Sequence, residues 1–276
     1  MKSFLSEKAV VMNFSNIYEK QAFKDKEDFI YEDVSDITGT DCYCDDKATA
    51  GIKARIEQFS YRGIHYIDSG NYHYMSKLWL DKADKEFVLV VFDNHPDMQP
   101  PAFGNILSCG GWIKEALESN RFLQKVVVIG VNGELTDEIY NTDEDVRKEV
   151  DSGRARFITR QQIAKETDCS ADGCEDTYVN IYDRDVKNFV GENKSVYISI
   201  DKDVLDESVV KTNWDQGDMR LNEMYSYIKY IMKENELLGV DVCGEPLYED
   251  AVNEELIIKS NAVNEDIFNI IKKFLT

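Results

Sequence analysis

A segment with metal-binding character lies where an apolar run passes directly into acidic and histidine residues. Residues Phe87–Asp93 read as a strand, and Asp93-Asn94-His95-Pro96-Asp97 occupies its end. Because extended backbone alternates its side chains, Asp93, His95 and Asp97 are expected to face one side together. Two carboxylates and an imidazole that converge would repel each other or lose solvation unless a cation lay between them. The segment therefore predicts a metal site; the alternative is a polar strand end with a capping Asp and a solvated His.

A second acidic segment repeats this arrangement. The apolar run Ser195–Asp201 ends in Asp201-Lys202-Asp203, and Asp206 follows three residues later. Asp201 and Asp203 are expected to share a face, whereas Lys202 points away from it. The alternative is an acidic loop that starts a helix, with Asp206 as its cap.

The chain contains three histidines, His65, His73 and His95. His65 lies within the predicted strand Gly63–Asp68 and is assigned to packing, whereas His73 follows that strand. A lone His among aromatic residues is usually a packed core residue, but combined with the two acidic segments His73 becomes a candidate ligand. An oxygen-rich set with a minority of imidazoles suits two divalent cations, manganese rather than zinc or copper. The candidate metal ligands are His73, Asp93, His95, Asp97, Asp201 and Asp203.

The elements that must position these residues alternate between strands and helices. Short β-branched or aromatic runs predict strands at Ala9–Asn13, Gly63–Asp68, Phe87–Asp93, Val126–Val131, Arg156–Ile158, Ser195–Asp201 and Leu238–Val242. Amphipathic stretches predict helices at Gly110–Leu123, Thr136–Ser152, Thr177–Phe189 and Leu221–Glu236, and the polar segment Glu166–Asp176 predicts a surface loop. This alternation predicts a three-layer α/β/α fold with a mainly parallel central sheet, where ligands bind at the carboxyl ends of the strands. No linker or repeat interrupts residues 1–276, so a single domain is expected.

Charge and composition limit the partners of the chain. It has 32 Lys plus Arg against 53 Asp plus Glu, a formal net charge of -21. So acidic a protein repels phosphate groups, so neither nucleic acid nor an anionic membrane is an expected partner. The N-terminal residues lack the apolar core of a signal peptide, and no run approaches the roughly 18 apolar residues of a membrane helix. The cytoplasm is therefore the expected compartment.

Six cysteines in a chain without a secretory signal are expected to be free thiols. The pairs Cys42 with Cys44 and Cys169 with Cys174 are alternative zinc ligands, but neither has the usual spacing of two tight pairs.

Taken together, the candidate segments resemble the ureohydrolases, the family of arginase, agmatinase, guanidinobutyrase and formimidoylglutamase. Gly70-Asn71-Tyr72-His73 stands where the family has Gly-Gly-Asp-His, and Asp93-Asn94-His95-Pro96-Asp97 stands where it has Asp-Ala-His-x-Asp. The segment Ser199–Asp206 matches the family's Ser-x-Asp-x-Asp-x-x-Asp in full. The resemblance covers roughly residues 60–250.

The resemblance implies a hydrolase that cleaves a linear C–N bond of a small guanidine or amidine compound, with two cations that activate water. It also implies that Asp203 carries a proton to the leaving amine. Because family members often form trimers or hexamers, a homo-oligomer is a further expectation. The implied ligands are His73 and Asp97 for one cation, His95 and Asp203 for the other, and Asp93 and Asp201 for both.

Two departures from the family concern the substrate. The last strand of the family ends in Asp-x-x-Glu, whose Glu holds the guanidinium; here that position is Gly244, and Glu245 follows it. A one-residue bulge would bring Glu245 into the site as a catalytic and substrate-binding residue; the alternative is an exposed loop residue. The loop that holds the amino-acid end of arginine keeps Gly104-Asn105 but lacks a histidine, so arginine itself is not the expected substrate. Asn105 and Gln99 are the other expected substrate-binding residues.

Two other functions remain open. One is the deacetylase branch of the same superfamily, which binds one zinc and removes acetyl groups from amines. That branch lacks counterparts of His73 and Asp97, so their presence favours two metals. The other is a non-catalytic relative that keeps metals for stability, or a metal-binding regulatory protein.

Overall fold

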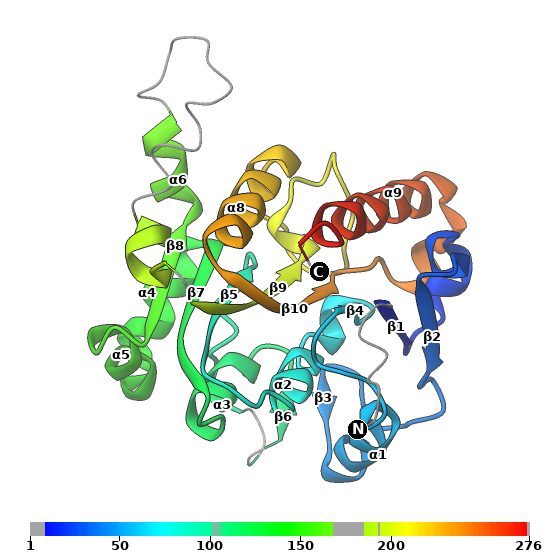
Figure 1. Ribbon diagram of the computed structural model, residues 1–276, viewed down its shortest axis with the longest axis horizontal. Coiled ribbons are helices and arrows are strands. Elements are labelled where there is room, and N and C mark those ends of the chain that lie inside the picture. Colours follow the sequence, from blue (N-terminus) through cyan, green and yellow to red (C-terminus); the bar gives the residue numbers. More distant parts are fainter. Residues whose placement is uncertain (1–8, 102–103, 105, 168–184, 193, 275–276) are drawn as a thin grey trace.

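The computed structural model describes residues 9–101, 104, 106–167, 185–192 and 194–274. At its centre these residues form an eight-stranded sheet in which all neighbouring strands are parallel (Figure 1). The strand order is β2-β1-β4-β10-β9-β5-β7-β8. The strands are β1 (Ala9–Asn13), β2 (Phe29–Asp33), β4 (Ile64–Tyr66), β5 (Phe87–Phe92), β7 (Leu123–Val131), β8 (Ala155–Thr159), β9 (Ser195–Asp201) and β10 (Glu236–Cys243). A separate antiparallel pair consists of β3 (Tyr43–Cys44) and β6 (Leu107–Ser108).

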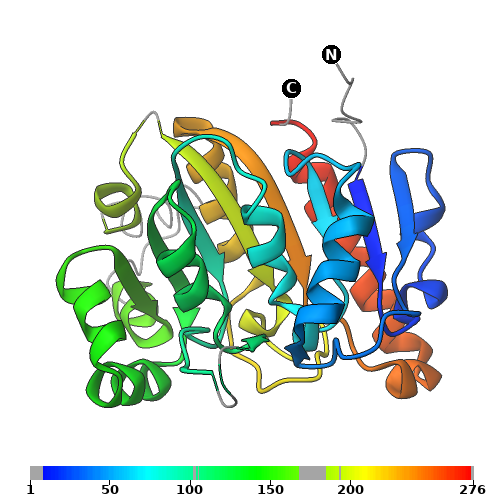
Figure 2. The same cartoon turned by 90° about the horizontal axis from the view of Figure 1, so that it is seen from below.

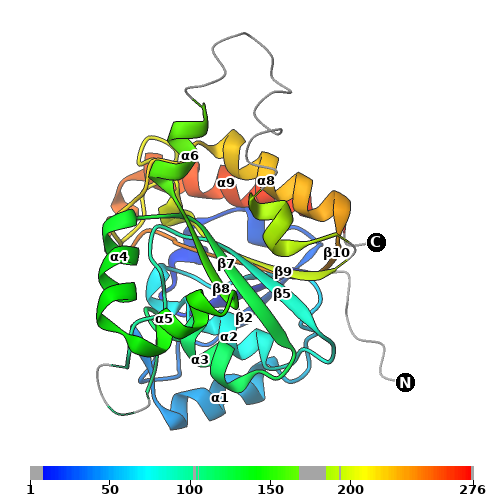
Figure 3. The ribbon, with the colours of Figure 1, turned by 90° about the vertical axis from the view of Figure 1, so that its left-hand side faces the viewer.

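Helices cover both faces of the sheet (Figures 1 and 3). On one face lie α6 (Arg160–Thr167), α8 (Leu221–Glu234) and α9 (Glu254–Ile271). On the other face lie α1 (Asp46–Ile56), α2 (Met75–Leu80), α3 (Trp112–Ser119), α4 (Gly133–Thr142) and α5 (Glu144–Asp151). The predicted three-layer α/β/α fold with a mainly parallel sheet is therefore confirmed. None of the helices in the described part of the chain is long and apolar enough to cross a membrane.

The continuous apolar sequence of β5 follows from its central place in the sheet. Its side chains alternate between the two core layers and are all buried. Val90 and Phe92 belong to the layer that contains α8 and α9, whereas Leu89 and Val91 belong to the layer that contains α1, α2 and α3. A parallel strand covered on both faces needs apolar residues at every position, which explains why its period-2 pattern is absent from the sequence.

All seven predicted strands are present; Ala9–Asn13 and Ser195–Asp201 have the predicted ends, and the other five have changed ends. The predicted strand Gly63–Asp68 shortens to β4, and the predicted helix Thr136–Ser152 is wrong as a single helix because it divides into α4 and α5. The division occurs where the Asp143 side chain accepts hydrogen bonds from the backbone N–H groups of Asp145 and Val146, and so caps a new helix.

Most of the predicted helix Thr177–Phe189 lies outside the described residues, although residues 185–190 are helical. Most of the predicted loop Glu166–Asp176 also lies outside the described residues. Its first two residues, Glu166 and Thr167, belong to helix α6 instead of a loop. Strand β2 has mostly partly exposed or exposed side chains, while β3 and β6 have two residues each, so none of the three carries a strong sequence pattern.

The carboxyl ends of four adjacent strands set the position of the candidate site. Strands β4, β10, β9 and β5 are consecutive neighbours and run in the same direction (Figure 2). Residues that follow these strands are therefore brought to one edge of the sheet, although they come from distant parts of the sequence.

Candidate metal centre

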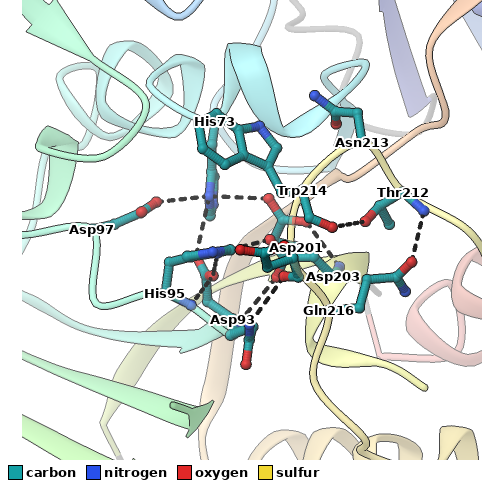
Figure 4. A network of polar contacts seen from close by, with 12 residues as sticks. His73, Asp93, His95, Asp97, Asp201, Asp203, Thr212, Asn213, Trp214 and Gln216 are labelled. Carbon is teal, nitrogen blue, oxygen red and sulfur yellow. Dashed lines mark hydrogen bonds and ion pairs between the residues drawn. The ribbon is translucent and has the colours of Figure 1, made fainter. Parts of the chain in front are cut away.

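The six predicted metal ligands meet at this edge of the sheet (Figure 4). The turn Gly70–Tyr72 after β4 places His73, and the end of β9 with the following turn places the second acidic pair. The three residues from the first acidic segment follow β5 directly. Five of the six are at least nine-tenths buried, and only His95 is partly exposed, with 18% of its side chain accessible.

One group of ligands surrounds His73. Its Nδ1 lies 2.9 Å from Asp97 Oδ2, 3.3 Å from Asp93 Oδ2 and 3.4 Å from Asp201 Oδ2. The other ring nitrogen, Nε2, is 2.9 Å from Ser199 Oγ. A proton on Nε2 that is shared with the hydroxyl would leave the Nδ1 lone pair free for a metal.

A second group surrounds His95. Its Nδ1 lies 2.9 Å from Asp203 Oδ2 and 3.5 Å from Asp93 Oδ1. Asp93 therefore presents one carboxylate oxygen to each histidine and belongs to both groups. This is the geometry required of a carboxylate that bridges two cations.

The backbone reaches this arrangement by turning, so the expectation of an extended Asp93–Asp97 segment is wrong. Strand β5 ends at Phe92, and Asp97 has a φ of 46°, in the left-handed region. In the second segment, the backbone N–H of Asp203 donates to Asp201 Oδ1 at 3.0 Å, which tightens the turn after β9. Lys202 points away from the ligands, as expected, and is fully buried.

Neighbouring side chains hold two of the carboxylates in place. Trp112 Nε1 donates to Asp97 Oδ2 at 2.7 Å, and Cys243 Sγ donates to Asp201 Oδ2 at 3.0 Å. Neither residue was predicted from the sequence. Cys243 ends β10, which lies between β4 and β9, so its position at the end of a predicted strand was the available signal. Trp112 had no such signal because it comes from α3.

The electrostatics of the ligand set call for positive charge. Burial, followed by the charge of Asp203, raises the pKa of Asp201 to about 7, and burial with the charge of Asp93 raises the pKa of Asp203 to about 6. Burial on its own lowers the pKa of His95, but the hydrogen bonds and charges of Asp203 and Asp93 outweigh it and raise that pKa to about 12. These shifts show a site that binds protons strongly, as expected where carboxylates converge without a cation.

One buried oxygen supports a metal in particular. Asp93 Oδ2 is buried and accepts no hydrogen bond. An unpaired buried carboxylate oxygen is unfavourable, and a cation between the two histidine groups would satisfy it. The ligand chemistry and this oxygen both fit a pair of divalent cations.

A pocket of about 230 Å³ opens onto the ligands. Its walls come from the β3–β6 pair, from the segment after β5 and from the loop that contains Trp214. Among the described residues that line the pocket, the acidic ones are the four carboxylate members of the candidate ligand set, Asp93, Asp97, Asp201 and Asp203. No Lys or Arg is among these lining residues. Besides His73 and His95, the other lining side chains are Cys42, Tyr43, Gln99, Pro100, Ser108, Cys109 and Trp214.

The three residues expected to bind substrate do not lie together in the structure. Gln99 lines the pocket, whereas Asn105 lies outside the described residues. Glu245 does not line the pocket, so the expectation that it faces the substrate is wrong, and so is its alternative as an exposed loop residue. Its carboxylate pairs with Lys202 Nζ, and both side chains are completely buried.

Gly244 explains why Glu245 points elsewhere. Its φ of 85° turns the chain between Cys243, which contacts Asp201, and Glu245, which contacts Lys202. The Cβ of any other residue at position 244 would lie 2.5 Å from Asp201 Oδ1 and 2.7 Å from Lys202 N. The position that corresponds to the family's Glu therefore has no room for a side chain.

We expect the substitution Gly244→Glu, which puts a carboxylate at the family position, to destabilise the protein instead of adding a substrate contact. The left-handed φ costs a non-glycine residue about 1–2 kcal/mol, and the overlap with Asp201 and Lys202 adds about 1–3 kcal/mol. Urea unfolding would measure the loss. The control is Gly153→Glu, because Gly153 has a φ of 77° but open space around its Cβ. Equal losses in the two variants would contradict the steric explanation.

The remaining predictions concern His65 and the cysteine pairs. His65 is packed, as expected: its ring stacks on Trp79 with centroids 3.8 Å apart, and its Nδ1 lies 2.9 Å from Asp241 Oδ1. Among the described residues, neither Cys42 nor Cys44 belongs to a group able to hold a metal ion. Cys169 and Cys174 lie outside the described residues.

Solved structures with similar folds include three enzymes. Proclavaminate amidino hydrolase from Streptomyces clavuligerus has a TM-score of 0.63 and 13% identity, over 96% of this chain and 92% of that one. Agmatine ureohydrolase of Thermoplasma volcanium has a TM-score of 0.63 and 15% identity, over 97% and 90%. Formiminoglutamase of Trypanosoma cruzi, with Mn²⁺, has a TM-score of 0.61 and 10% identity, over 98% and 94%. At these identities the likeness shows a shared fold.

Sequence comparison gives the family. An uncharacterised protein of Thermotoga maritima is 29% identical over 188 residues, which are 68% of this chain and 60% of that protein. The chain thus matches about three fifths of the length of this relative. The model of the arginase family matches residues 11–257. Because this match covers most of the sequence, the chain belongs to the arginase family.

Proposed function

We propose that the protein is a binuclear metal hydrolase that cleaves a linear C–N bond of a small guanidine or amidine compound other than arginine. The observation that carries this proposal is the sharing of Asp93 between two ligand groups, with one of its oxygens left without a hydrogen bond. A single-metal site would not need the His73 and Asp97 pair, whose contacting atoms lie 2.9 Å apart. The geometry therefore favours two metals over the one-zinc deacetylase.

Manganese is the metal that we infer. The ligand set contains four carboxylates and two imidazoles, and oxygen-rich sites of this kind suit Mn²⁺. The structurally similar formiminoglutamase contains Mn²⁺. A bound pair of divalent cations supplies Lewis-acid activation of water and of the bond to be cleaved. His73 and Asp97 would hold one cation and His95 and Asp203 the other, while Asp93 and Asp201 would bridge them.

The residues around the cations have separate roles. Asp203 accepts hydrogen bonds from Asn94 N and the His95 ring, which fix its carboxylate at the pocket, where it would carry a proton to the leaving amine. Ser199 and Trp112 are positioning residues, because they act through His73 and Asp97.

The pocket walls support a small planar cation as substrate. With position 244 lacking a side chain, no additional carboxylate from the described residues lines the pocket. Tyr43 and Trp214 do line it, and aromatic faces attract guanidinium and amidinium groups. Gln99 supplies an amide that can donate to or accept from polar groups of the substrate. We therefore infer recognition by aromatic and amide groups in place of the family's Glu.

Metal analysis combined with a substrate panel tests this function. We expect two equivalents of Mn²⁺ per chain, and release of urea or an amine from one or more guanidines or amidines. Replacing Asp201 with Ala should remove metal and hydrolysis together. The control is Asp206→Ala, because Asp206 belongs to the same motif, but its carboxylate accepts a hydrogen bond from Ser208 N in the loop and belongs to neither ligand group. One zinc and cleavage of acetylated amines would support a deacetylase, and two metals without hydrolysis would support a non-catalytic relative.

A further inference from the structure

Two cysteines face each other across the small antiparallel pair. In that pair Tyr43 lies opposite Ser108 and Cys44 opposite Leu107, so Cys42 continues the register opposite Cys109. The backbone N–H of Cys109 donates to the carbonyl oxygen of Cys42 at 2.9 Å. Opposite residues in a hydrogen-bonded antiparallel pair have Cα atoms about 5.5 Å apart, which lies within the range that a disulfide can span.

The backbone at Cys42 is held in an unusual conformation. Its φ is 57°, and the N–H of Tyr43 donates to the carbonyl oxygen of Asp41 at 2.6 Å, which closes a three-residue turn around Cys42. Such turns are rare and strained for residues other than glycine, and strain of this kind is concentrated at functional sites. Asn71 Nδ2 holds the turn by donating to Asp41 Oδ1 at 2.7 Å.

The thiols of Cys42 and Cys109 contact each other within the pocket wall. Both residues line the pocket and are partly exposed, whereas Cys44 and Cys243 are buried. A hydrogen bond from the Cys109 thiol lowers the pKa of Cys42, and the same contact, with burial, raises the pKa of Cys109. Cys42 is therefore the thiol that loses its proton more readily, and Cys109 is its hydrogen-bond donor, which is an arrangement suited to a reactive dithiol.

We propose that Cys42 and Cys109 form a redox-active dithiol in the wall of the pocket and are oxidised to a disulfide by a peroxide. The Cys42 sulfur attacks one peroxide oxygen, the O–O bond breaks, and one water leaves. The Cys109 sulfur then displaces the second oxygen as water while the S–S bond forms. The two thiols lose two protons and two electrons, and one hydrogen peroxide becomes two waters.

The surroundings of the pair favour a small uncharged oxidant. Asp41 Oδ1 lies 4.0 Å from Cys42 Sγ, and the charge of Asp97 acts on Cys109. These carboxylates repel anionic disulfides such as oxidised glutathione, whereas hydrogen peroxide carries no charge. A disulfide would join the chain before β3 to the chain after β6 and so fix the two strands of this pocket wall to each other.

The test uses the full chain, reduced and freed of metal with a chelator, so that its result does not depend on the proposed hydrolase. The protein is treated with hydrogen peroxide, alkylated and digested with trypsin. We expect a peptide that joins residues 27–47 to residues 86–114 and separates on reduction. The variants Cys42→Ser and Cys109→Ser should lose this product completely, and Cys109→Ser should trap a sulfenic acid at Cys42.

The matched control is Cys44→Ser, which removes the other thiol of the same peptide. Cys44 Sγ lies 3.2 Å from Thr49 Oγ1 and not across from a cysteine, so this variant should still form the product. A product that is lost in Cys44→Ser but kept in Cys42→Ser would overturn the assignment. The absence of any joined peptide, with both cysteines recovered in alkylated form, would overturn it as well.

Discussion

Replacing Asp93 with Asn should abolish metal-dependent stabilisation while leaving the metal-free protein close to its original stability. The amide keeps the shape of the side chain and an oxygen to accept the hydrogen bond from His95 N, which is 2.6 Å long. It removes the charge that both ligand groups share. Loss of an outer contact to a metal ligand typically weakens binding by about 10- to 100-fold, so loss of the proposed bridging ligand should weaken metal binding by more than about 100-fold.

Thermal unfolding with and without Mn²⁺ measures this effect. A metal at one hundred times its Kd stabilises the folded state by about 2.7 kcal/mol, which for a chain of this size corresponds to a Tm increase of about 5–10 °C. We expect this increase in the original protein and almost none in Asp93→Asn. Asp206→Asn serves as the control. The Asp206 carboxylate lies outside both ligand groups, so this variant should keep the full Tm increase. An Asp93→Asn protein with an unchanged increase would show that the metals bind elsewhere.

The buried ion pair between Lys202 and Glu245 should have the largest effect on folding stability. Both side chains are completely buried, and Lys202 lies in the chain between the candidate metal ligands Asp201 and Asp203. Removing one partner leaves an uncompensated charge, so Lys202→Met and Glu245→Leu should each reduce the free energy of unfolding by about 3–5 kcal/mol.

The partners of the pair determine what a double substitution can recover. Glu245 Oε2 accepts from Ser260 Oγ and Gln21 Nε2, each at 2.5 Å, and Asn264 Nδ2 donates to Glu245 Oε1 at 2.7 Å. In Lys202→Met/Glu245→Leu these three donors lose their acceptor. Each loss lowers the free energy of unfolding by about 1–3 kcal/mol unless the donor finds another partner. The double variant should nevertheless be more stable than the sum of the single effects predicts, by about 1.5 kcal/mol or more. Strictly additive effects in urea unfolding would contradict a direct pair.

The same variants separate two roles for Glu245. We expect Glu245→Gln to lower stability while the protein still binds two metals, because Glu245 belongs to neither ligand group. If Glu245→Gln instead kept full stability and raised only the KM of a guanidine substrate, Glu245 would act in the pocket as the family's Glu does.

Local sequence is enough to predict the types of the candidate ligands and the strands that carry them. Asp93, His95 and Asp97 are adjacent in the chain and follow an apolar run, so their chemistry could be predicted from local spacing. The presence of the buried strands was predictable for a related reason, because each apolar run has only a few residues and is bounded by polar ones. The family motifs then related the separate segments to one another.

Which of these residues lie close together depends on the order of the strands in the sheet. The order β4-β10-β9-β5 brings His73, Asp93 and Asp201 together, and no single segment contains that order. The left-handed φ of Gly244 decided that Cys243 contacts a ligand and that Glu245 pairs with Lys202, because one backbone rotation reverses the direction of the next side chain. Side-chain direction at a turn depends on the space that neighbouring strands leave, and local sequence does not encode that space.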